Sequence, residues 1–238
     1  MIKVRGLSKA FNGQKVLDAL DLDVATGEIL AVMGPSGTGK SVLLLNLIGL
    51  MAPDAGEIDI DGVLVNRLPE RALLKFRRQV GYLFQDNALY DFMTVEENLA
   101  FPLREHGQIK SAQIKAKVRE FLVMVDMADA GSRYPSELSG GMRKRAALAR
   151  AMVTGSKVLL CDEPTSGLDP VRSRDISFLI RDLSKKLGCT TVITTHDVKN
   201  AFRCADRAIV LQRGRIVAQG IEQELRVSTD PFVKEFLE

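Results

Sequence analysis

The sequence predicts an α/β fold with a mixed central sheet, a small antiparallel β subdomain and an inserted helical subdomain. Three observations favour this class. Short alternating segments open the chain, strand-sized apolar runs recur along it, and between Phe84 and Val158 the only strong patterns are helical. The chain has 238 residues, of which 46% are hydrophobic and 26% charged, a composition typical of a folded domain with a substantial core. Disordered and fibrous architectures are therefore excluded.

The first elements are expected to be antiparallel strands. Val16–Val24 alternates apolar and polar residues, and the turn dipeptides Asn12-Gly13 and Thr26-Gly27 punctuate residues 1–33. Glu28–Met33 is then an apolar strand that runs into a glycine-rich loop, and Ser41–Leu50 has helical composition. The chain thus passes from a small β layer into a strand, loop and helix.

Further strands and helices are expected along the rest of the chain. The strands are Glu57–Ile60, Val80–Phe84, Val158–Cys161, Thr190–Thr195, Ala208–Gln212 and Arg215–Ala218. The helices, with apolar residues three and four apart, are Thr94–Leu103, Ser111–Asp126 and Ser139–Thr154. We therefore expect one domain, with a core and β subdomain at about 1–85 and 155–227, a helical subdomain at about 86–154 and a tail at 228–238.

Charge and composition exclude several functions. The chain has 33 Lys and Arg against 30 Asp and Glu, which gives a net charge of +3. This charge is too small for nucleic acid to be the main partner. Apolar runs such as Ile29–Met33 fall far short of the roughly 20 residues that span a bilayer. Residues 1–6 show no export signal, so we expect a cytosolic location. Cys161, Cys189 and Cys204 form no CxxC pair and are expected to be reduced core residues.

Residues 34–41, GPSGTGKS, match the pattern G-x-x-x-x-G-K-[ST] between a predicted strand and a predicted helix, which is the context that the pattern requires. Such a loop binds nucleotide phosphates through inward-pointing backbone N–H groups and the positive end of the helix dipole. Lys40 is expected to reach the β- and γ-phosphates, and the Ser41 hydroxyl to ligate Mg²⁺. The alternative is a chance glycine-rich turn. The expected nucleotide-binding residues of this loop are Gly34, Ser36, Gly37, Thr38, Gly39, Lys40 and Ser41.

A second apolar strand, Val158–Cys161, ends in two carboxylates. Asp162 is placed to hold Mg²⁺ through water, and Glu163 to polarise an attacking water. Alone, this pair could equally lie in a solvated loop, but together with the phosphate loop it predicts nucleotide hydrolysis. Asp162 follows Lys40 by many more residues than one βαβ unit needs, so a subdomain is inserted between the two.

Within that insertion, Leu138–Arg145 (LSGGMRKR) is a second Ser/Gly turn that opens a basic amphipathic helix, whose N-terminus is suited to hold an anion. With these segments in this order, the sequence resembles the nucleotide-binding subunits of ATP-binding cassette (ABC) transporters over essentially its whole length. The resemblance implies a P-loop NTPase fold, ATP and Mg²⁺ as nucleotide and metal, and ATP hydrolysis coupled to transport. It also implies a catalytic glutamate at Glu163 and a switch histidine at His196 that together hold the attacking water.

The resemblance assigns further site residues. Gln85 is implied to reach Mg²⁺ and the attacking water, so that the metal ligands are Ser41, Gln85 and Asp162. Phe11 is implied to stack on adenine. The remaining nucleotide-contacting residues are the signature residues Ser139, Gly140 and Gly141, and Asp169 of the segment SGLD at 166–169.

Three of these assignments have alternatives or depart from the family pattern. Met142 stands where the family signature usually has Gln, but Ser139 and the backbone donors after it remain, so we expect activity to survive. Phe11 stands where Tyr is common; its ring still offers a π face, and a plain core position is the alternative. Taken alone, His196 would be a core histidine or one locked in a single tautomer, and only its place after the carboxylate strand argues otherwise. The other histidine, His106, is expected to be an exposed loop residue.

The resemblance also implies partners. In this fold the signature loop lies too far from the phosphate loop of the same chain to complete one ATP site, so a head-to-tail homodimer with ATP between the loops is implied. Residues 86–93, DNALYDFM, are implied to line a groove for a helix of a membrane permease subunit. Alternatively, Leu89, Tyr90 and Phe92 pack under the helical subdomain.

Three function classes remain open. They are the ATPase subunit of a membrane transporter, a chromosome or DNA-repair ATPase, and a cassette protein acting on ribosomes or cluster assembly. The second class needs a long coiled coil between phosphate loop and signature, and the third usually carries two cassettes, so the first is favoured. No nucleic-acid partner is expected.

Residues 101–106 and 135–151, with Met142, look like the ATPases of Mla/Mce-type lipid transport. That resemblance implies phospholipid cargo, an Mce-domain lipid-binding protein in the complex, and a location on the cytoplasmic face of the inner membrane. The tail at 228–238 also resembles that group's C-terminal extension, which docks on the opposite ATPase; an ordinary capping helix is the alternative. The competing interpretation is an importer of amino acids or other small solutes, or a lipoprotein-release system.

Overall fold

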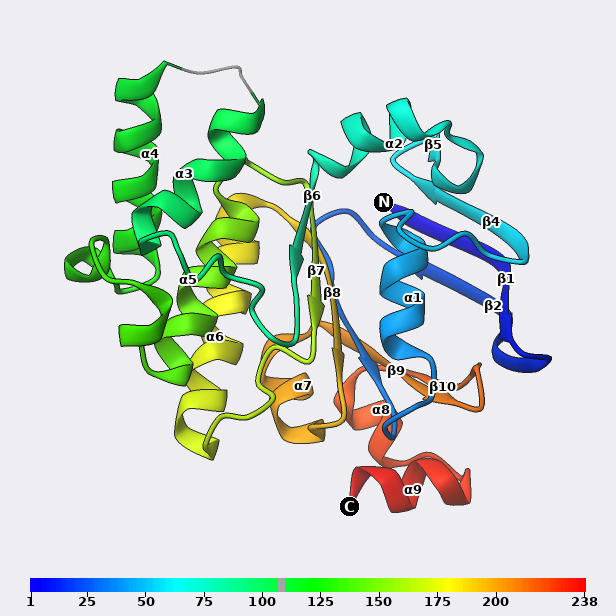
Figure 1. Cartoon of the computed structure of the whole chain (residues 1–238). Helices are drawn as coiled ribbons and strands as arrows, with labels where there is room; N and C mark the ends of the chain where they lie inside the picture. The colour runs from blue at the N-terminus through cyan, green and yellow to red at the C-terminus, as the bar shows by residue number, and fades with distance from the viewer. Residues whose placement is uncertain (107–109) are drawn as a thin grey trace.

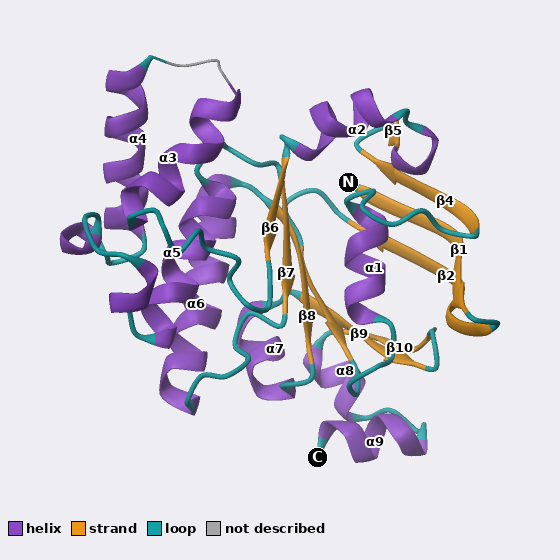
Figure 2. Cartoon of the chain, viewed as in Figure 1, coloured by secondary structure: helices purple, strands orange, loops and turns teal. Residues whose placement is uncertain are grey.

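Two β-sheets organise the molecule, and most of the helices cover the larger sheet (Figure 1). The computed structural model describes residues 1–106 and 110–238. Figure 2 shows the helical subdomain on one side of the larger sheet and the smaller sheet on the other. The expected α/β fold, with a mixed central sheet, an antiparallel β layer and an inserted helical region, is confirmed.

The smaller sheet is antiparallel, with strand order β2-β1-β4-β5. Its strands are β1 (Ile2–Phe11), β2 (Gln14–Val24), β4 (Ala55–Ile60) and β5 (Val63–Leu64). Asn12 and Gly13 join β1 to β2 with φ values of +50° and +80°, the left-handed pair that a tight two-residue hairpin requires. The predicted opening hairpin is therefore present.

The larger sheet has the order β10-β9-β3-β8-β7-β6. Its strands are β3 (Ile29–Met33), β6 (Val80–Leu83), β7 (Val158–Asp162), β8 (Thr190–Thr195), β9 (Arg207–Gln212) and β10 (Arg215–Gly220). All neighbours pair in parallel except β9 and β10, which form an antiparallel hairpin. Because parallel strands end at the same edge, the segments that follow β3, β6, β7 and β8 meet there.

The helices differ in part from those expected. They are α1 (Lys40–Leu47), α2 (Glu70–Arg77), α3 (Val95–His106), α4 (Ser111–Met124), α5 (Gly140–Met152), α6 (Pro170–Leu187), α7 (Val198–Cys204), α8 (Glu222–Arg226) and α9 (Pro231–Leu237). Single 3₁₀ turns lie at Val65–Arg67, Ala128–Ala130 and Pro135–Glu137. Four of the helices, α1, α3, α4 and α5, agree with the expected helices apart from their ends. Because α3 extends to His106, that residue closes a helix rather than lying in a loop, and its side chain is outside the described residues.

The core consists of three apolar clusters that the larger sheet separates. One lies between this sheet and helices α3 to α6. The second lies between the two sheets and contains α1, which Figure 1 shows between them. The third joins β3 and β9 to α7, α8 and α9. Cys161, Cys189 and Cys204 are buried and free, as expected.

None of the helices in the described part of the chain combines the length and the apolar composition needed to cross a bilayer.

Candidate functional site

The loop after β3 surrounds the N-terminus of α1 and holds Lys40 in its hollow. Gly39 caps this helix with φ +98°, and a Cβ there would stand 2.7 Å from the Val16 carbonyl oxygen, so only glycine fits. Lys40 is 5% exposed. Its Nζ donates to the carbonyl oxygens of Gly34 (2.8 Å) and Pro35 (3.0 Å). A buried ammonium therefore sits beside the backbone N–H groups at the start of α1, which together favour an anionic ligand.

Strand β7 brings Asp162 to the hydroxyl group of Ser41. Asp162 Oδ1 accepts hydrogen bonds from Ser41 Oγ (2.9 Å) and from Thr194 Oγ1 (2.7 Å). Asp162 and Thr194 are register partners on the parallel strands β7 and β8, so the sheet itself fixes this contact. Tyr82 on β6 lies on the other side of β7, and burial, with the charge of Asp162 second, raises the pKa of its phenol.

Glu163 lies between Lys40 and His196, two side chains expected in the site. Its carboxylate is 3.4 Å from Lys40 Nζ and 2.9 Å from His196 Nδ1. Its φ is +44°, a left-handed conformation that is rare for a residue with a side chain and that occurs often at active sites. The backbone N–H of Glu163 donates to the Thr194 carbonyl oxygen at 3.1 Å. The strained turn directs Glu163 out of the sheet and into the site.

His196 is not a core histidine. Its side chain is 58% exposed, and it follows β8 directly, beside the end of β7. Contact with Glu163 and exposure at the edge of the sheet agree with the position of a residue that meets a ligand. The structure thus brings together Lys40, Ser41, Asp162, Glu163 and His196.

The donors at this site fit Mg²⁺ bound together with a nucleotide. Within the described residues, no three His, Cys, Asp or Glu side chains group to hold a metal. Mg²⁺ usually takes one or two protein oxygens and completes its shell with phosphate oxygens and waters. The adjacent hydroxyl of Ser41 and carboxylate of Asp162 are such hard oxygen donors. Gln85 follows β6 at the same edge with an exposed side chain, and its role as a ligand stays a prediction.

The signature residues form a second helix N-terminus. Ser139 is exposed and caps α5, where its Oγ accepts from the Met142 N–H at 3.4 Å. Gly140 lies against Leu168, and Gly141 against Arg172. No hydrogen bond or ion pair among the described residues joins Ser139 to the phosphate loop of the same chain. The contact of Ser139, Gly140 and Gly141 with nucleotide stays a prediction.

Asp169 and Phe11 lie outside this cluster. Asp169 caps α6 by accepting from the N–H groups of Val171 and Arg172, and these bonds, the one to Arg172 most, lower its pKa. Its observed role is that of a helix cap, and a contact with nucleotide stays a prediction. Phe11 ends β1, is 43% exposed and has Lys9 Nζ 5.7 Å from its ring centroid, so it is not a plain core residue.

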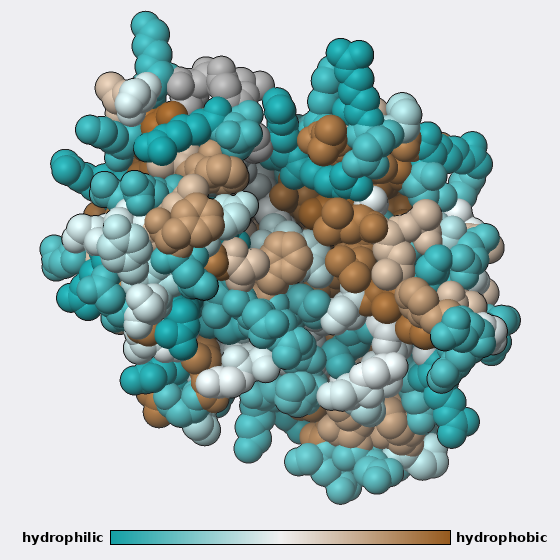
Figure 3. All heavy atoms as spheres, viewed as in Figure 1, coloured by the Kyte–Doolittle hydropathy of each residue, from teal (hydrophilic) through white to brown (hydrophobic). Residues whose placement is uncertain are grey.

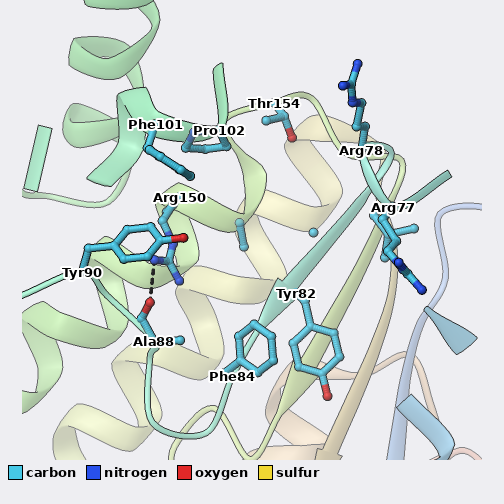
Figure 4. A pocket seen from close by; sticks show the side chains of 13 residues that line it. Arg77, Arg78, Tyr82, Phe84, Ala88, Tyr90, Phe101, Pro102, Arg150 and Thr154 are labelled. Carbon is cyan, nitrogen blue, oxygen red and sulfur yellow. Dashed lines mark hydrogen bonds between the residues drawn. The ribbon is translucent and has the colours of Figure 1, made fainter. Parts of the chain in front are cut away.

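A groove of about 320 Å³ opens between the helical subdomain and the ends of α2 and β6 (Figure 4). Two aromatic pairs lie in it: Tyr82 and Phe84, with ring centroids 4.3 Å apart, and Tyr90 and Phe101, at 5.1 Å. Phe92, next to Tyr90, is 76% exposed. Figure 3 shows hydrophobic side chains gathered in a band below α2. Leu89 does pack under the helical subdomain, but the neighbouring aromatics remain accessible.

Sequence analysis missed three residues that hold the site together. Thr194 holds Asp162, Lys144 donates from α5 to the carbonyl oxygen of Gln85, and Arg150 donates to that of Ala88 at 2.7 Å. The signal for Thr194 was its place near the end of a strand beside β7. No local pattern signals the other two contacts, because each joins residues about sixty positions apart.

Comparison with known proteins is consistent with this geometry. A protein-family profile described as "ABC transporter" matches residues 17–166. The chain is 43% identical over 236 residues to the probable ribonucleotide transport ATP-binding protein mkl of Mycobacterium leprae, covering 99% of this chain and 68% of that protein. It is 39% identical over 238 residues to the intermembrane phospholipid transport system ATP-binding protein MlaF of Escherichia coli, covering 100% of this chain and 88% of that protein.

Two further comparisons concern import and structure. The methionine import ATP-binding protein MetN of Carboxydothermus hydrogenoformans is 40% identical over 241 residues, covering 100% of this chain and 71% of that protein. The ATP-binding cassette MJ0796, in a dimeric post-hydrolysis state bound to ADP and Pi, superposes with a TM-score of 0.85 at 31% identity, covering 93% of this chain and 98% of that one. The chain spans about two thirds of the length of the mycobacterial relatives, 66% for that of Mycobacterium tuberculosis.

Proposed function

The chain belongs to the ABC transporter family as an ATP-binding subunit that hydrolyses ATP with Mg²⁺, and we propose that it powers phospholipid transport through a membrane permease. The observation that supports the lipid assignment is the similarity to MlaF along the whole chain. The comparable similarity to MetN keeps import of a small solute such as an amino acid as the second candidate.

In the proposed mechanism, the phosphate loop binds and orients ATP. Residues 34–41 offer backbone N–H groups to the phosphates, and Lys40 exchanges its bonds to the Gly34 and Pro35 carbonyls for bonds to phosphate oxygens. Ser41, Asp162 and Gln85 would hold Mg²⁺, which would neutralise charge on the phosphates when bound. Because Thr194 fixes Asp162, this side of the site is arranged before the nucleotide arrives.

Glu163 acts as the general base in this proposal. Its carboxylate accepts a proton from the water that attacks the γ-phosphate, and His196, 2.9 Å away, holds that carboxylate and the water in line. The left-handed backbone at Glu163 keeps the group at the rim of the sheet, where a water reaches both it and the nucleotide.

A second copy completes the site. The signature residues Ser139, Gly140 and Gly141 lie at the start of α5, where Ser139 is exposed, Gly140 is half-buried and Gly141 is buried. We assign them to the ATP bound by the opposite chain of a head-to-tail homodimer. ATP then stabilises the closed dimer and hydrolysis removes that stabilisation, which converts chemical energy into motion. The MJ0796 cassettes, which share the fold, are described as dimers, and this supports the assignment.

The same proposal gives each predicted part of the chain a task. The core at 1–85 and 155–227 binds ATP, and the helical subdomain at 86–154 carries the signature. The groove between them, rimmed by Tyr90, Phe101 and Arg150, receives a helix of the permease. This places the chain on the cytoplasmic face of the inner membrane, in a complex that includes an Mce-domain lipid-binding protein.

Affinity purification from native membranes tests this function. The Glu163→Gln chain, which holds ATP without turning it over, is isolated with a mild tag, and its proteins and lipids are identified by mass spectrometry. A permease with an Mce-domain protein and bound phospholipid is the expected result. A solute-importer permease would favour the second candidate, and recovery of the chain without any membrane protein would contradict the transporter role.

A further inference from the structure

A buried lysine of the signature helix holds the main chain at Gln85. Lys144 is 3% exposed, and its Nζ donates to the Gln85 carbonyl oxygen. Lys144 lies on α5, whose first turn carries the signature residues, whereas Gln85 follows the edge strand β6 of the larger sheet. One side chain therefore ties the start of α5 to the backbone of a predicted catalytic residue.

The charge of Lys144 points to a role beyond filling space. Burial lowers the pKa of this amine, and the carboxylates of Asp86, Asp162 and Glu163 act in the opposite direction. An apolar side chain of similar length would pack here without the desolvation penalty of an ammonium. What the ammonium adds is a charge-assisted hydrogen bond to a carbonyl oxygen, which is stronger and more directional than a neutral one.

The loop that Lys144 holds is conformationally strained. Asn87 and Ala88 both have left-handed backbones, with φ values of +65° and +50°. Their carbonyl oxygens accept hydrogen bonds from the guanidinium of Arg150, also on α5, at 3.1 and 2.7 Å. Consecutive left-handed residues with side chains persist only when surrounding contacts hold them. Two cations of α5, together with backbone hydrogen bonds from Asn87 and Ala88 within the loop, thus hold residues 85–88 in this shape.

We propose that Lys144 is a positioning residue for Gln85. By fixing the Gln85 carbonyl to α5, it directs the Gln85 side chain toward the edge of the sheet where Ser41 and Asp162 lie. The inference rests on the proposed role of Gln85 as a ligand of Mg²⁺ and of the attacking water. Arg150 holds Asn87 and Ala88 and thereby limits how far the loop can drift when Lys144 is replaced.

The test compares steady-state ATP hydrolysis by full-length variants. Lys144→Met is expected to lower kcat about tenfold. This is the loss that follows when one charge-assisted hydrogen bond contributes its full free energy to stabilising the transition state. It should also raise the Mg²⁺ concentration that gives half-maximal rate, while the KM for ATP changes less than about twofold. Lys144→Arg should restore most of kcat. Lys157→Met, which removes an exposed lysine just before β7, is the matched control and should match the parent chain.

A double variant separates positioning from general support of the fold. If Lys144 acts through Gln85, adding Lys144→Met to Gln85→Ala should lower kcat no further than Gln85→Ala alone. Multiplied losses would overturn the proposal, as would a uniform fall in kcat, ATP affinity and melting temperature that Lys144→Arg does not restore. Should Lys144→Met fail to fold, Lys144→Gln, which keeps a donor of shorter reach, takes its place.

The same variants of Gln85 and Lys144 show whether a failure concerns the positioning role of Lys144 or the proposed role of Gln85. Full activity of Gln85→Ala would remove the proposed role of Gln85 and the inference with it. A low kcat for Gln85→Ala beside an unchanged kcat for Lys144→Met would leave the role of Gln85 standing and overturn the inference alone.

Discussion

Glu163 combines three features that are typical of a residue with a catalytic task. It is buried, its backbone is left-handed, and its carboxylate contacts both Lys40 and His196. Glu163→Gln keeps the size of the side chain but takes away the proton acceptor. We expect kcat to fall about 10²- to 10⁴-fold while ATP still binds.

Phosphate release under saturating ATP measures this loss, and a nucleotide-binding titration measures the affinity. Glu120→Gln, on the exposed face of α4, makes the same chemical change away from the site and serves as the control. If Glu163→Gln released phosphate at the parent rate, another group would have to be the base.

Replacing Thr194 or Thr191 distinguishes a residue that supports the site from one that supports only the fold. Both are buried on β8, but Thr194 Oγ1 bonds Asp162 at 2.7 Å, whereas Thr191 Oγ1 bonds Ser184 on α6 at 2.9 Å. Each Thr→Val change removes a hydrogen bond to a buried side chain, so both should lower the free energy of unfolding by about 1–3 kcal/mol.

Only Thr194→Val should also reduce kcat, because only that hydroxyl holds a predicted metal ligand. Chemical denaturation and ATPase assays on the two variants check this pair. Equal kcat values in Thr194→Val and Thr191→Val would mean that Asp162 needs no help from β8.

At the scale of the elements, the tail helix α9 packs on its own chain. Val233 and Leu237 are buried in the cluster that includes Val210 and Leu225, and the Phe232 and Phe236 rings stack beside them at 6.1 Å. This favours a capping helix. Val233→Ala removes two buried methyl groups and should lower the free energy of unfolding by about 2 kcal/mol.

The exposed neighbour Glu235 provides the control, since Glu235→Ala should change stability by less than about 0.5 kcal/mol. Thermal or denaturant unfolding of the two single-chain variants gives the comparison. A stability unchanged by Val233→Ala would show that α9 is not held by its own chain, and would revive docking on an opposite subunit.

Sequence patterns predicted the elements whose signal is local and strong. The phosphate loop, the apolar strands of the larger sheet and the helices of the insertion all follow from motif or periodicity. Helix α6 was not predicted although its signals are present: Asp169 as cap, Pro170 in the first turn and Gly188 with φ +66° at the end. Helix α2 was missed because only Phe76 of its eight residues is buried, so its apolar stripe is too narrow to recognise.

Only those site residues that belong to a sequence motif or directly follow a predicted strand could be predicted. Lys40, Ser41, Asp162, Glu163 and His196 were expected, and the parallel order of β3, β8 and β7 explains why they meet. The backbone strain at Glu163 and the contact from Lys144 to Gln85 depend on how distant segments pack, which no local pattern records.

At the scale of the molecule, the catalytic cluster and the signature lie at two helix N-termini that can each bind phosphate. Among the described residues, no hydrogen bond or ion pair joins Ser139 to the phosphate loop of the same chain. In a head-to-tail pair of chains, the signature of each chain faces the phosphate loop of the other chain. Two-fold symmetry makes both contacts at once, so the pair is closed. ATP should therefore cause dimerisation, and Glu163→Gln should make that dimer long-lived by stopping hydrolysis. Light scattering with ATP and Mg²⁺ is expected to show a mass twice that of the chain.

A second substitution in the Glu163→Gln chain tests whether the two chains of this dimer meet through the signature. Ser139→Phe places a bulky ring on the exposed signature serine, so it should abolish the ATP-dependent dimer while leaving ATP binding to the single chain unchanged, because Lys40 and Ser41 are untouched. Ser132→Phe, at an exposed serine beside a hollow that residues of α3 and α4 line, should dimerise normally. A Ser139→Phe chain that still dimerised with ATP would show that the two copies meet through another surface, and one that lost ATP affinity as a monomer would place the signature in the site of its own chain.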